Sequence, residues 1–270
     1  MDWTIWAGLA AGLLISTVTA PVGVSGAVFL LPVQLSVLGV PSPAVTPTNL
    51  LFNVVAGPGA LWRYRRDGAL GGGLARRLVL WTLPGVIVGA AVRVFALPGP
   101  DVFRVLVAAL LLPLGMWLCL RTLRRRPARQ RPDGGPDAGP DAADPSAPVL
   151  ACLALTVGVV GGIYGIGGGS LLGPVLAARG MPMARIAPAT LAATFTTSVA
   201  GAAAYAVLAL ASSGPVAPDW WLGLACGLGG LIGGYLGARL QPHLPETALC
   251  LLLGALAAGL GALYAVQALR

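Results

Sequence analysis

Lysine is absent from this sequence, and charged residues of all kinds make up only 10% of its 270 positions. Soluble domains carry about 25% charged residues, so this chain lacks the polar surface that a water-exposed fold needs. Hydrophobic residues account for 57% of the sequence, and the mean hydropathy is +0.84. These values predict an integral membrane protein of the all-α class, built from several membrane-spanning helices.

Acidic side chains are scarce where an ion pump would need them. Only nine aspartate and glutamate residues are present, and none falls in the middle of a long apolar run. A buried carboxylate is the usual group for a proton relay or for binding a multivalent cation within a membrane, so a cation pump is disfavoured. The sequence also lacks the Gly-Lys-Ser/Thr end of a Walker phosphate loop, which argues against ATP as the energy source.

Cysteine and histidine are too few and too scattered for a metal site or a disulfide framework. The four cysteines lie in apolar runs without a short repeated spacing, and His243 is the single histidine. We therefore predict no metal site, no cofactor and no catalytic residues. A membrane-embedded enzyme is the least favoured alternative, because the sequence shows no nucleophile, base or metal cluster.

Positive charge comes from 17 arginines, most of them clustered between apolar runs. Arginine in such segments places them on the cytoplasmic side of a membrane. Aromatic residues do not alternate with these arginines, so we predict no nucleic-acid partner and expect contacts with membrane lipids instead. Arg93 and Arg104 lie near the ends of apolar runs, where their side chains are expected to reach the lipid headgroups.

The stretch that stands out is Gly-Ile-Gly-Gly-Gly-Ser at residues 165–170, with Pro174 shortly after it. Glycine leaves the backbone unrestrained and proline removes a hydrogen-bond donor, so an ordinary helix would end here. At membrane depth, a broken helix persists only where protein packs around it or where it lines a wet cavity. The glycine cluster therefore marks a candidate functional site.

A weaker copy of this pattern occurs in the first half of the chain. Identical residues recur in the two halves 142 positions apart. From Gly39 onward the separation is 141 positions, because the second copy is one residue shorter. The matched pairs are Gly23 and Gly165, Gly26 and Gly168, Pro32 and Pro174, Val33 and Val175, Gly39 and Gly180, Pro41 and Pro182, Pro47 and Pro188, and Leu50 and Leu191. The pattern predicts two homologous repeats.

Each repeat divides into full spans and one short, interrupted segment. A crossing takes roughly 20 apolar residues, so we predict about eight full transmembrane helices and two short Gly/Pro-broken segments. The predicted domains are a first repeat at 1–120, a flexible cytoplasmic linker rich in arginine, aspartate and proline at 121–147, and a second repeat at 148–270. No basic segment precedes residues 3–20, so we expect them to remain in the mature protein rather than to be removed as a signal peptide.

The apolar runs also predict where the helices lie. Full spans are expected at about 3–20, 46–62, 78–97, 102–120, 148–164, from 187 onward, 219–238 and 247–268, and the short segments at about 22–38 and 165–178.

Two arrangements of the halves fit the arginine pattern differently. If the short segments re-enter, each half has four spans, and Arg179, Arg185 and Arg239 lie outside while both termini are cytoplasmic. If the short segments cross, the second half is inverted and these three arginines move to the cytoplasm. The arginine count favours the inverted arrangement. A helix of about 15 residues covers only about 22 Å, so whether the short segments cross fully stays open.

The candidate substrate-binding residues come from the breaks and from the helices that follow them. They are Gly23, Ser25, Gly26, Asn49, Asn53, Gly167, Gly168, Gly169, Ser170, Thr190 and Thr194. A broken helix offers free backbone N–H groups and the positive end of its dipole, which is an anion site without charged side chains. Interrupted segments at matching positions in two halves are typical of transporter substrate sites. The alternative is structural, with glycines allowing close helix packing and polar groups bonding between helices.

Several features resemble the sulfite exporter TauE/SafE family. They are the Gly-Gly-Gly-x-x-x-x-Pro pattern from Gly167 to Pro174, the Gly-x-Pro beginning at Gly180, the threonine-rich helix after Pro188, the weaker first-half copy and the basic central loop. The resemblance implies a multi-spanning transporter of the cytoplasmic membrane for sulfite, sulfoacetate and other sulfur-containing anions. In the first copy, Ser25 and Ala27 replace two glycines, so the halves need not contribute equally to a site.

We therefore expect a secondary transporter that moves a small sulfur-containing anion, of the sulfite or organosulfonate type, by alternating access of two repeats around the broken helices. A permease for another small solute on the same scaffold is the alternative. The sequence is compatible with either import or export. It is also compatible with either a monomer or a homo-oligomer.

Overall fold

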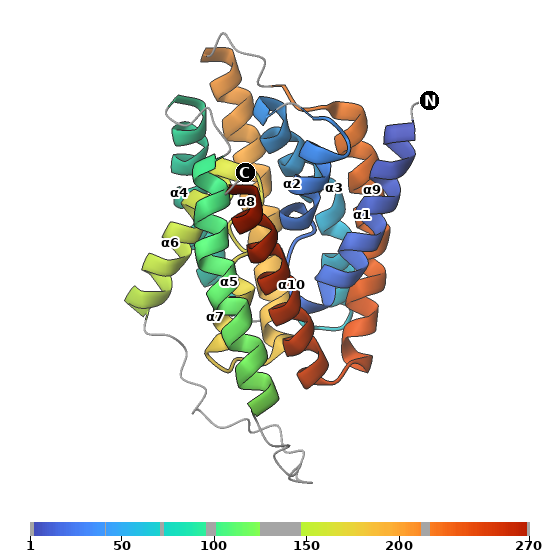
Figure 1. The fold of residues 1–270 in the computed structure, drawn as a ribbon, viewed down its shortest axis with the longest axis vertical. Coiled ribbons are helices and arrows are strands. Elements are labelled where there is room, and N and C mark those ends of the chain that lie inside the picture. Colours follow the sequence, from blue (N-terminus) through green and yellow to red (C-terminus); the bar gives the residue numbers. More distant parts are fainter. Residues whose placement is uncertain are drawn as a thin grey trace.

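The computed structural model describes residues 3–40, 42–70, 73–95, 101–124, 147–211 and 217–268. The described residues form a bundle of helices, as expected for the all-α class (Figure 1). The helices are α1 (Trp3–Thr19), η1 (Ala20–Val22), α2 (Ala27–Ser36), α3 (Ser42–Arg66), α4 (Gly73–Phe95), α5 (Asp101–Arg124), α6 (Ala147–Tyr164), α7 (Leu172–Ala178), α8 (Met183–Ala211), α9 (Trp220–Leu240), η2 (Gln241–His243) and α10 (Glu246–Ala268). Most of the expected linker, residues 125–146, lies outside the described residues.

Within the described residues, five helical segments are long and apolar enough to cross a membrane. They are Trp3–Val22, Gly73–Phe95, Met183–Leu208, Trp220–His243 and Glu246–Ala268. The chain is therefore a membrane protein with several spans. The full count of about eight spans stays a prediction.

The helices pack in pairs that correspond between the two halves. Helix α1 lies along α9, and α6 lies along α4. Helix α3 packs on α9, and α8 packs on α4. The pairs α3 with α8 and α5 with α10 join equivalent helices of the two halves. If each helix of α1–α5 is exchanged for its counterpart in α6–α10, every contact in this set becomes another contact of the same set.

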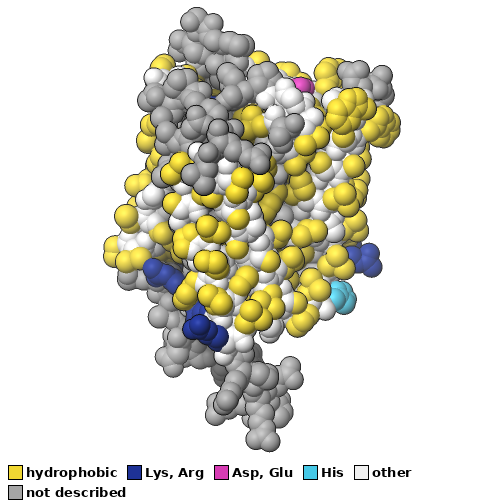
Figure 2. Space-filling view, in the orientation of Figure 1, with side chains coloured by type: hydrophobic (Ala, Val, Ile, Leu, Met, Phe, Trp, Pro, Cys, Tyr) yellow, Lys and Arg dark blue, Asp and Glu magenta, His cyan; other side chains and the backbone are white. Residues whose placement is uncertain are grey.

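In Figure 1, α1 begins at the upper end of the bundle and α6 begins at the lower end. Basic residues occupy the last turns of α3, α5 and α9. Figure 2 shows arginine side chains in the lower half of the visible face and an acidic side chain at the upper end. The molecule thus has one basic end, hereafter the arginine-rich end.

Glycines bring α1 and α9 into backbone contact. A β-carbon added to Gly12 would lie 2.0 Å from the carbonyl oxygen of Cys226, and one added to Gly229 would lie 2.0 Å from the carbonyl oxygen of Leu9. Such approaches are typical of membrane helices, where small residues replace the hydrophobic effect as the source of tight association.

Helices α3 and α8 begin about one turn earlier than predicted. The prediction placed Pro47 and Pro188 in the first turn, whereas the helices begin at Ser42 and Met183. In α8, the carboxylate of Glu246 accepts a hydrogen bond from the backbone N–H of Met183 at 2.8 Å. This cap comes from a residue distant in the sequence, so the local pattern could not indicate the extra turn.

Candidate functional site

Two pairs of glycines with left-handed backbone frame the two short segments. Gly23 and Gly165 have φ of +73° and +69°, and they precede α2 and α7. Gly39 and Gly180, with φ of +69° and +88°, follow the same two helices. Residues with a β-carbon rarely adopt this conformation, so glycine is required at these four positions. This requirement explains why the sequence match between the halves is strongest there.

Each half supplies a hydrogen bond to the break of the other half. Thr190, on α8, has its hydroxyl 2.7 Å from the carbonyl oxygen of Gly23. Asn53, on α3, donates from its amide nitrogen to the carbonyl oxygen of Gly165 at 3.3 Å. Both acceptors belong to the left-handed glycines, whose carbonyls are turned away from regular helix bonding. We call these two contacts the cross-half bonds.

Side chains of α3 also hold the first break in place. The hydroxyl of Ser25 donates to the amide oxygen of Asn53 and accepts from the backbone N–H of Ala27 at 3.1 Å. Asn49 donates from its amide nitrogen to the carbonyl oxygen of Ala27 at 3.2 Å. Ser25 thus satisfies the backbone N–H of Ala27, the first residue of α2, and ligand contact by these residues stays a prediction. The amide oxygen of Asn49 is buried without a hydrogen-bond partner among the described residues.

Threonines of α8 surround the second break. The backbone N–H of Gly168 donates to the hydroxyl of Thr197 at 2.9 Å. Ser170 donates to the carbonyl oxygen of Ile166 at 2.7 Å, and its hydroxyl lies 3.2 Å from that of Thr194. The N–H of Gly168 and the hydroxyl of Ser170 are therefore satisfied within the protein.

Protein atoms fill the space beside the three clustered glycines. An added β-carbon would lie 2.5 Å from Cγ2 of Thr194 at Gly167, 2.7 Å from Cβ of Thr82 at Gly168, and 2.1 Å from the carbonyl oxygen of Thr190 at Gly169. These contacts support the packing alternative for this half. Direct ligand contact by Gly167, Gly168 and Gly169 stays a prediction.

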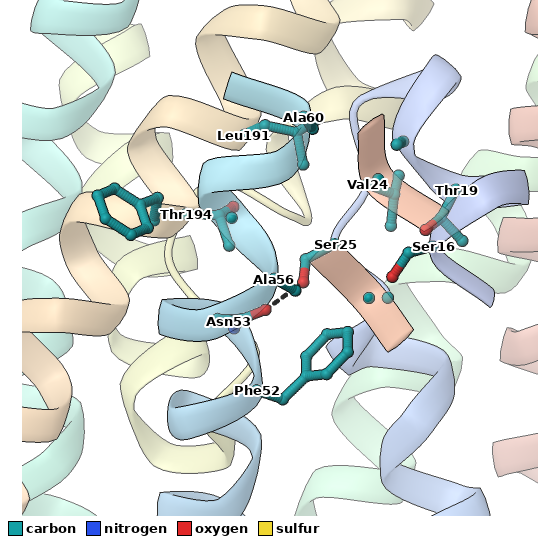
Figure 3. A pocket seen from close by; sticks show the side chains of 16 residues that line it. Ser16, Thr19, Val24, Ser25, Phe52, Asn53, Ala56, Ala60, Leu191 and Thr194 are labelled. Atoms are coloured by element: carbon teal, nitrogen blue, oxygen red, sulfur yellow. Dashed lines mark hydrogen bonds between the residues drawn. The ribbon is translucent and has the colours of Figure 1, made fainter. Parts of the chain in front are cut away.

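A small cavity of about 30 Å³ lies beside the first break instead (Figure 3). Its walls come from α1, the first break, α3, α8 and α9. The predicted residues Ser25, Gly26, Asn53 and Thr194 line it. The other predicted residues lie outside this cavity: Gly23, Gly167, Gly168, Gly169 and Ser170 form parts of the two breaks, and Asn49 and Thr190 hydrogen-bond to Ala27 and Gly23. We call this space the central cavity.

Two hydroxyls of the central cavity were missed by the sequence reasoning. Ser16 and Thr19 of α1 line it, and both side chains are buried. The hydroxyl of Thr19 has no hydrogen-bond partner among the described residues. Their spacing could have indicated them. Residues three apart lie on the same helix face, and Ser16 and Thr19 are two hydroxyl residues in an otherwise apolar run.

The polar groups that line the central cavity are hydroxyls and one amide. None of the described residues in its wall carries an ionisable side chain. A space of this size holds one or two water molecules. The cavity can therefore donate and accept hydrogen bonds without a fixed charge, and a solute of several heavy atoms requires its walls to part.

Arg93 departs from the sequence expectation. Its side chain is only 9% exposed, and it interacts electrostatically with Tyr164 and Tyr205. The expectation that it reaches out to the headgroups is wrong, because Arg93 lies on the buried side of the last turn of α4, whereas Phe95 of the same turn is exposed. The side chain of Arg104 lies outside the described part.

The family model for the sulfite exporter TauE/SafE matches residues 8–264, which covers nearly the whole chain and both broken segments. The chain belongs to the TauE/SafE family. This TauE/SafE protein is thus a member of a family of membrane transporters, as the sequence resemblance implied. No curated protein and no solved structure matches the chain.

Proposed function

We propose that this TauE/SafE protein carries a small sulfur-containing anion, of the sulfite or organosulfonate type, across the cytoplasmic membrane. The observation that supports the proposal is the pair of cross-half bonds, Thr190 to Gly23 and Asn53 to Gly165, beside a hydroxyl-lined cavity. Broken helices from two halves meet at the substrate in many secondary transporters.

The chemistry of the central cavity suits an anion that must be released again. Hydroxyls of Ser16 and Thr19 can donate to oxyanion oxygens, and α2 begins beside the cavity with the positive end of its dipole. A lysine or arginine in the wall would hold an anion more strongly and slow its departure. Neutral donors therefore favour turnover over tight binding.

The transport mechanism that we propose is alternating access between two inverted repeats. The corresponding helix pairs and the opposite starts of α1 and α6 support this arrangement. In it, eight helices span the membrane fully, and the short segments that contain α2 and α7 also pass from one side to the other, so that each half crosses five times. The central cavity is too small for an anion of several atoms, so the described conformation corresponds to a closed state.

A permease for a small neutral solute is the second candidate. The absence of ionisable side chains in the described wall of the central cavity favours it. The two candidates differ in their response to membrane potential, because carriage of an uncompensated anion moves charge and carriage of a neutral solute does not.

Uptake into proteoliposomes tests the proposal. The solutes are sulfite, sulfate, thiosulfate, small organosulfonates and a neutral solute of similar size. We expect sulfite or an organosulfonate to enter, and we expect the S25A and N53A variants to slow its entry at least tenfold. T156A is the matched control, because Thr156 is an exposed hydroxyl of α6 bonded only to Cys152 in its own helix.

Failure to transport any of these anions contradicts the substrate assignment. Entry of the neutral solute alone supports the second candidate. Equal rates for S25A, N53A and T156A, with all three eluting as monodisperse protein, contradict the placement of the site at the central cavity.

A further inference from the structure

A second, larger pocket lies on the surface of the helix bundle at the arginine-rich end. It has a volume of about 440 Å³ and is lined by Thr17, Leu236, Arg239, Leu240 and His243. Thr17 belongs to the last turns of α1, and the other four belong to the end of α9 and to η2. We call it the basic groove. Figure 2 shows the histidine colour together with an arginine near the lower edge of the visible face.

The end of α9 that carries the basic groove is held firmly. Gln241 is buried and donates from its amide nitrogen to the carbonyl oxygens of Pro21 at 2.8 Å and Met183 at 3.2 Å. The Nδ1 atom of His243 lies 3.2 Å from the carbonyl oxygen of Arg239, which fixes the ring relative to the helix end. The side chains of Arg239 and His243 therefore start from a fixed backbone, and both are exposed.

The walls of the basic groove are apolar below its basic tip. Leu236 and Leu240 are 40% and 47% exposed, and they flank Arg239 along the outward face of α9. A water-soluble anion gains nothing from these leucines, whereas an acyl chain buries against them. The basic groove thus has Arg239 and His243 at one end and an apolar wall of leucines beside them.

Aromatic residues place the basic groove at headgroup depth. The rings of Trp62 and Tyr235 lie 6.2 Å apart, and Tyr235 sits one helical turn before Arg239. Trp62 is 69% exposed, so its ring faces outward. Tryptophan and tyrosine concentrate at the boundary between hydrocarbon and headgroups. A phosphate at this level lies within reach of the side chains that end α9.

We propose that the basic groove binds the headgroup of an anionic phospholipid. Arg239 donates to the phosphate in the geometry that guanidinium groups favour. The ring of His243 contacts the same headgroup, and one acyl chain lies against Leu236 and Leu240. Basic pockets at the cytoplasmic ends of membrane helices bind anionic lipids by the same combination of forces. This inference is independent of the transported solute.

Native mass spectrometry of the full-length protein in detergent tests this inference, with phosphatidylglycerol and phosphatidylcholine titrated separately. We expect phosphatidylglycerol to bind more tightly, and the R239Q and H243Q variants to weaken it about fivefold each. Phosphatidylcholine binding should respond less to either variant, because choline offsets the charge of its phosphate. R185Q is the matched control, because Arg185 is an exposed arginine near the same end that does not line the groove.

Three results overturn the proposal. Equal losses in R239Q and R185Q indicate attraction to the whole basic end rather than a site. Unchanged phosphatidylglycerol binding in the R239Q/H243Q double variant shows that the groove is not used. Displacement of the lipid by millimolar inorganic phosphate shows that a free anion occupies it instead. Equal thermal midpoints of the lipid-free variants exclude misfolding as the cause of a loss.

Discussion

The hydroxyl of Tyr64 donates a hydrogen bond to the carbonyl oxygen of Ala20 at 3.2 Å, directly before the first break. Tyr205 makes the equivalent contact with Gly162, at 3.0 Å, before the second break. The tyrosines are 141 positions apart, which is the shift that relates the later parts of the two repeats. They extend the internal match to side chains with a defined contact, and they lie near opposite ends of the bundle.

Replacement of either tyrosine by phenylalanine should loosen the end of the bundle at which it lies. Each Tyr→Phe change removes one hydrogen bond to a backbone carbonyl, and we expect a loss of about 0.5–1.5 kcal/mol in the free energy of unfolding. Labelling of introduced cysteines should increase on the cytoplasmic side for Y64F and on the outer side for Y205F. An increase on the same side for both variants would contradict the inverted relation.

The packing role of Gly169 can be separated from general intolerance to substitution. An alanine at Gly169 places its β-carbon 2.1 Å from the carbonyl oxygen of Thr190, whereas at Gly173 the nearest atoms lie at an ordinary 3.6 Å. We expect G169A to cost about 1–3 kcal/mol of stability and G173A to be neutral. Thermal unfolding in detergent measures both, and a stable G169A protein would show that α8 can shift away from the break.

Thr19 and Thr197 should respond in opposite ways to replacement by valine. The hydroxyl of Thr19 has no partner among the described residues, so T19V should leave stability unchanged or slightly raised. Thr197 accepts from the backbone N–H of Gly168, so T197V should cost about 1–3 kcal/mol. If the hydroxyl of Thr19 binds substrate, T19V raises the KM for transport while the protein stays fully folded. A KM equal to that of wild type removes Thr19 from the site.

The inverted arrangement predicts the sides on which chain segments lie. A reporter inserted among residues 125–146 should be active in the cytoplasm, and a reporter at the C-terminus should be active outside. Cysteine labelling of R185C should succeed from the cytoplasmic side only. A cytoplasmic C-terminus would instead support the four-span arrangement with re-entrant segments.

The membrane class and the positions of the two breaks were predictable from sequence, while the two repeats stay a prediction. Left-handed backbone requires glycine at Gly23 and Gly165, and that requirement preserves the match between halves. Composition alone predicts burial in lipid. The glycine requirement is local in the sequence, and it holds in any protein that must break a helix at membrane depth.

The position of the central cavity was not predictable in this way. Sequence reasoning gave most weight to the glycine cluster of the second half, yet Thr194 and its neighbours pack against that cluster. The cavity opens at the first break, where Ser25 replaces a glycine and α1 adds Ser16 and Thr19. Its walls come from both halves, and which helix faces touch depends on packing over long sequence distances. The burial of Arg93 escaped prediction for the same reason.

The cross-half bonds have a consequence for how the chain can be divided. The carbonyl of Gly23 is satisfied by Thr190, and that of Gly165 by Asn53, so neither half contains all the partners for its own break. An isolated half must leave such a group unpaired in a lipid environment, where no water replaces the missing donor. Two separately produced halves should therefore recover a stable fold only when they are made together, which makes the complementary pair the smallest complete unit of this architecture.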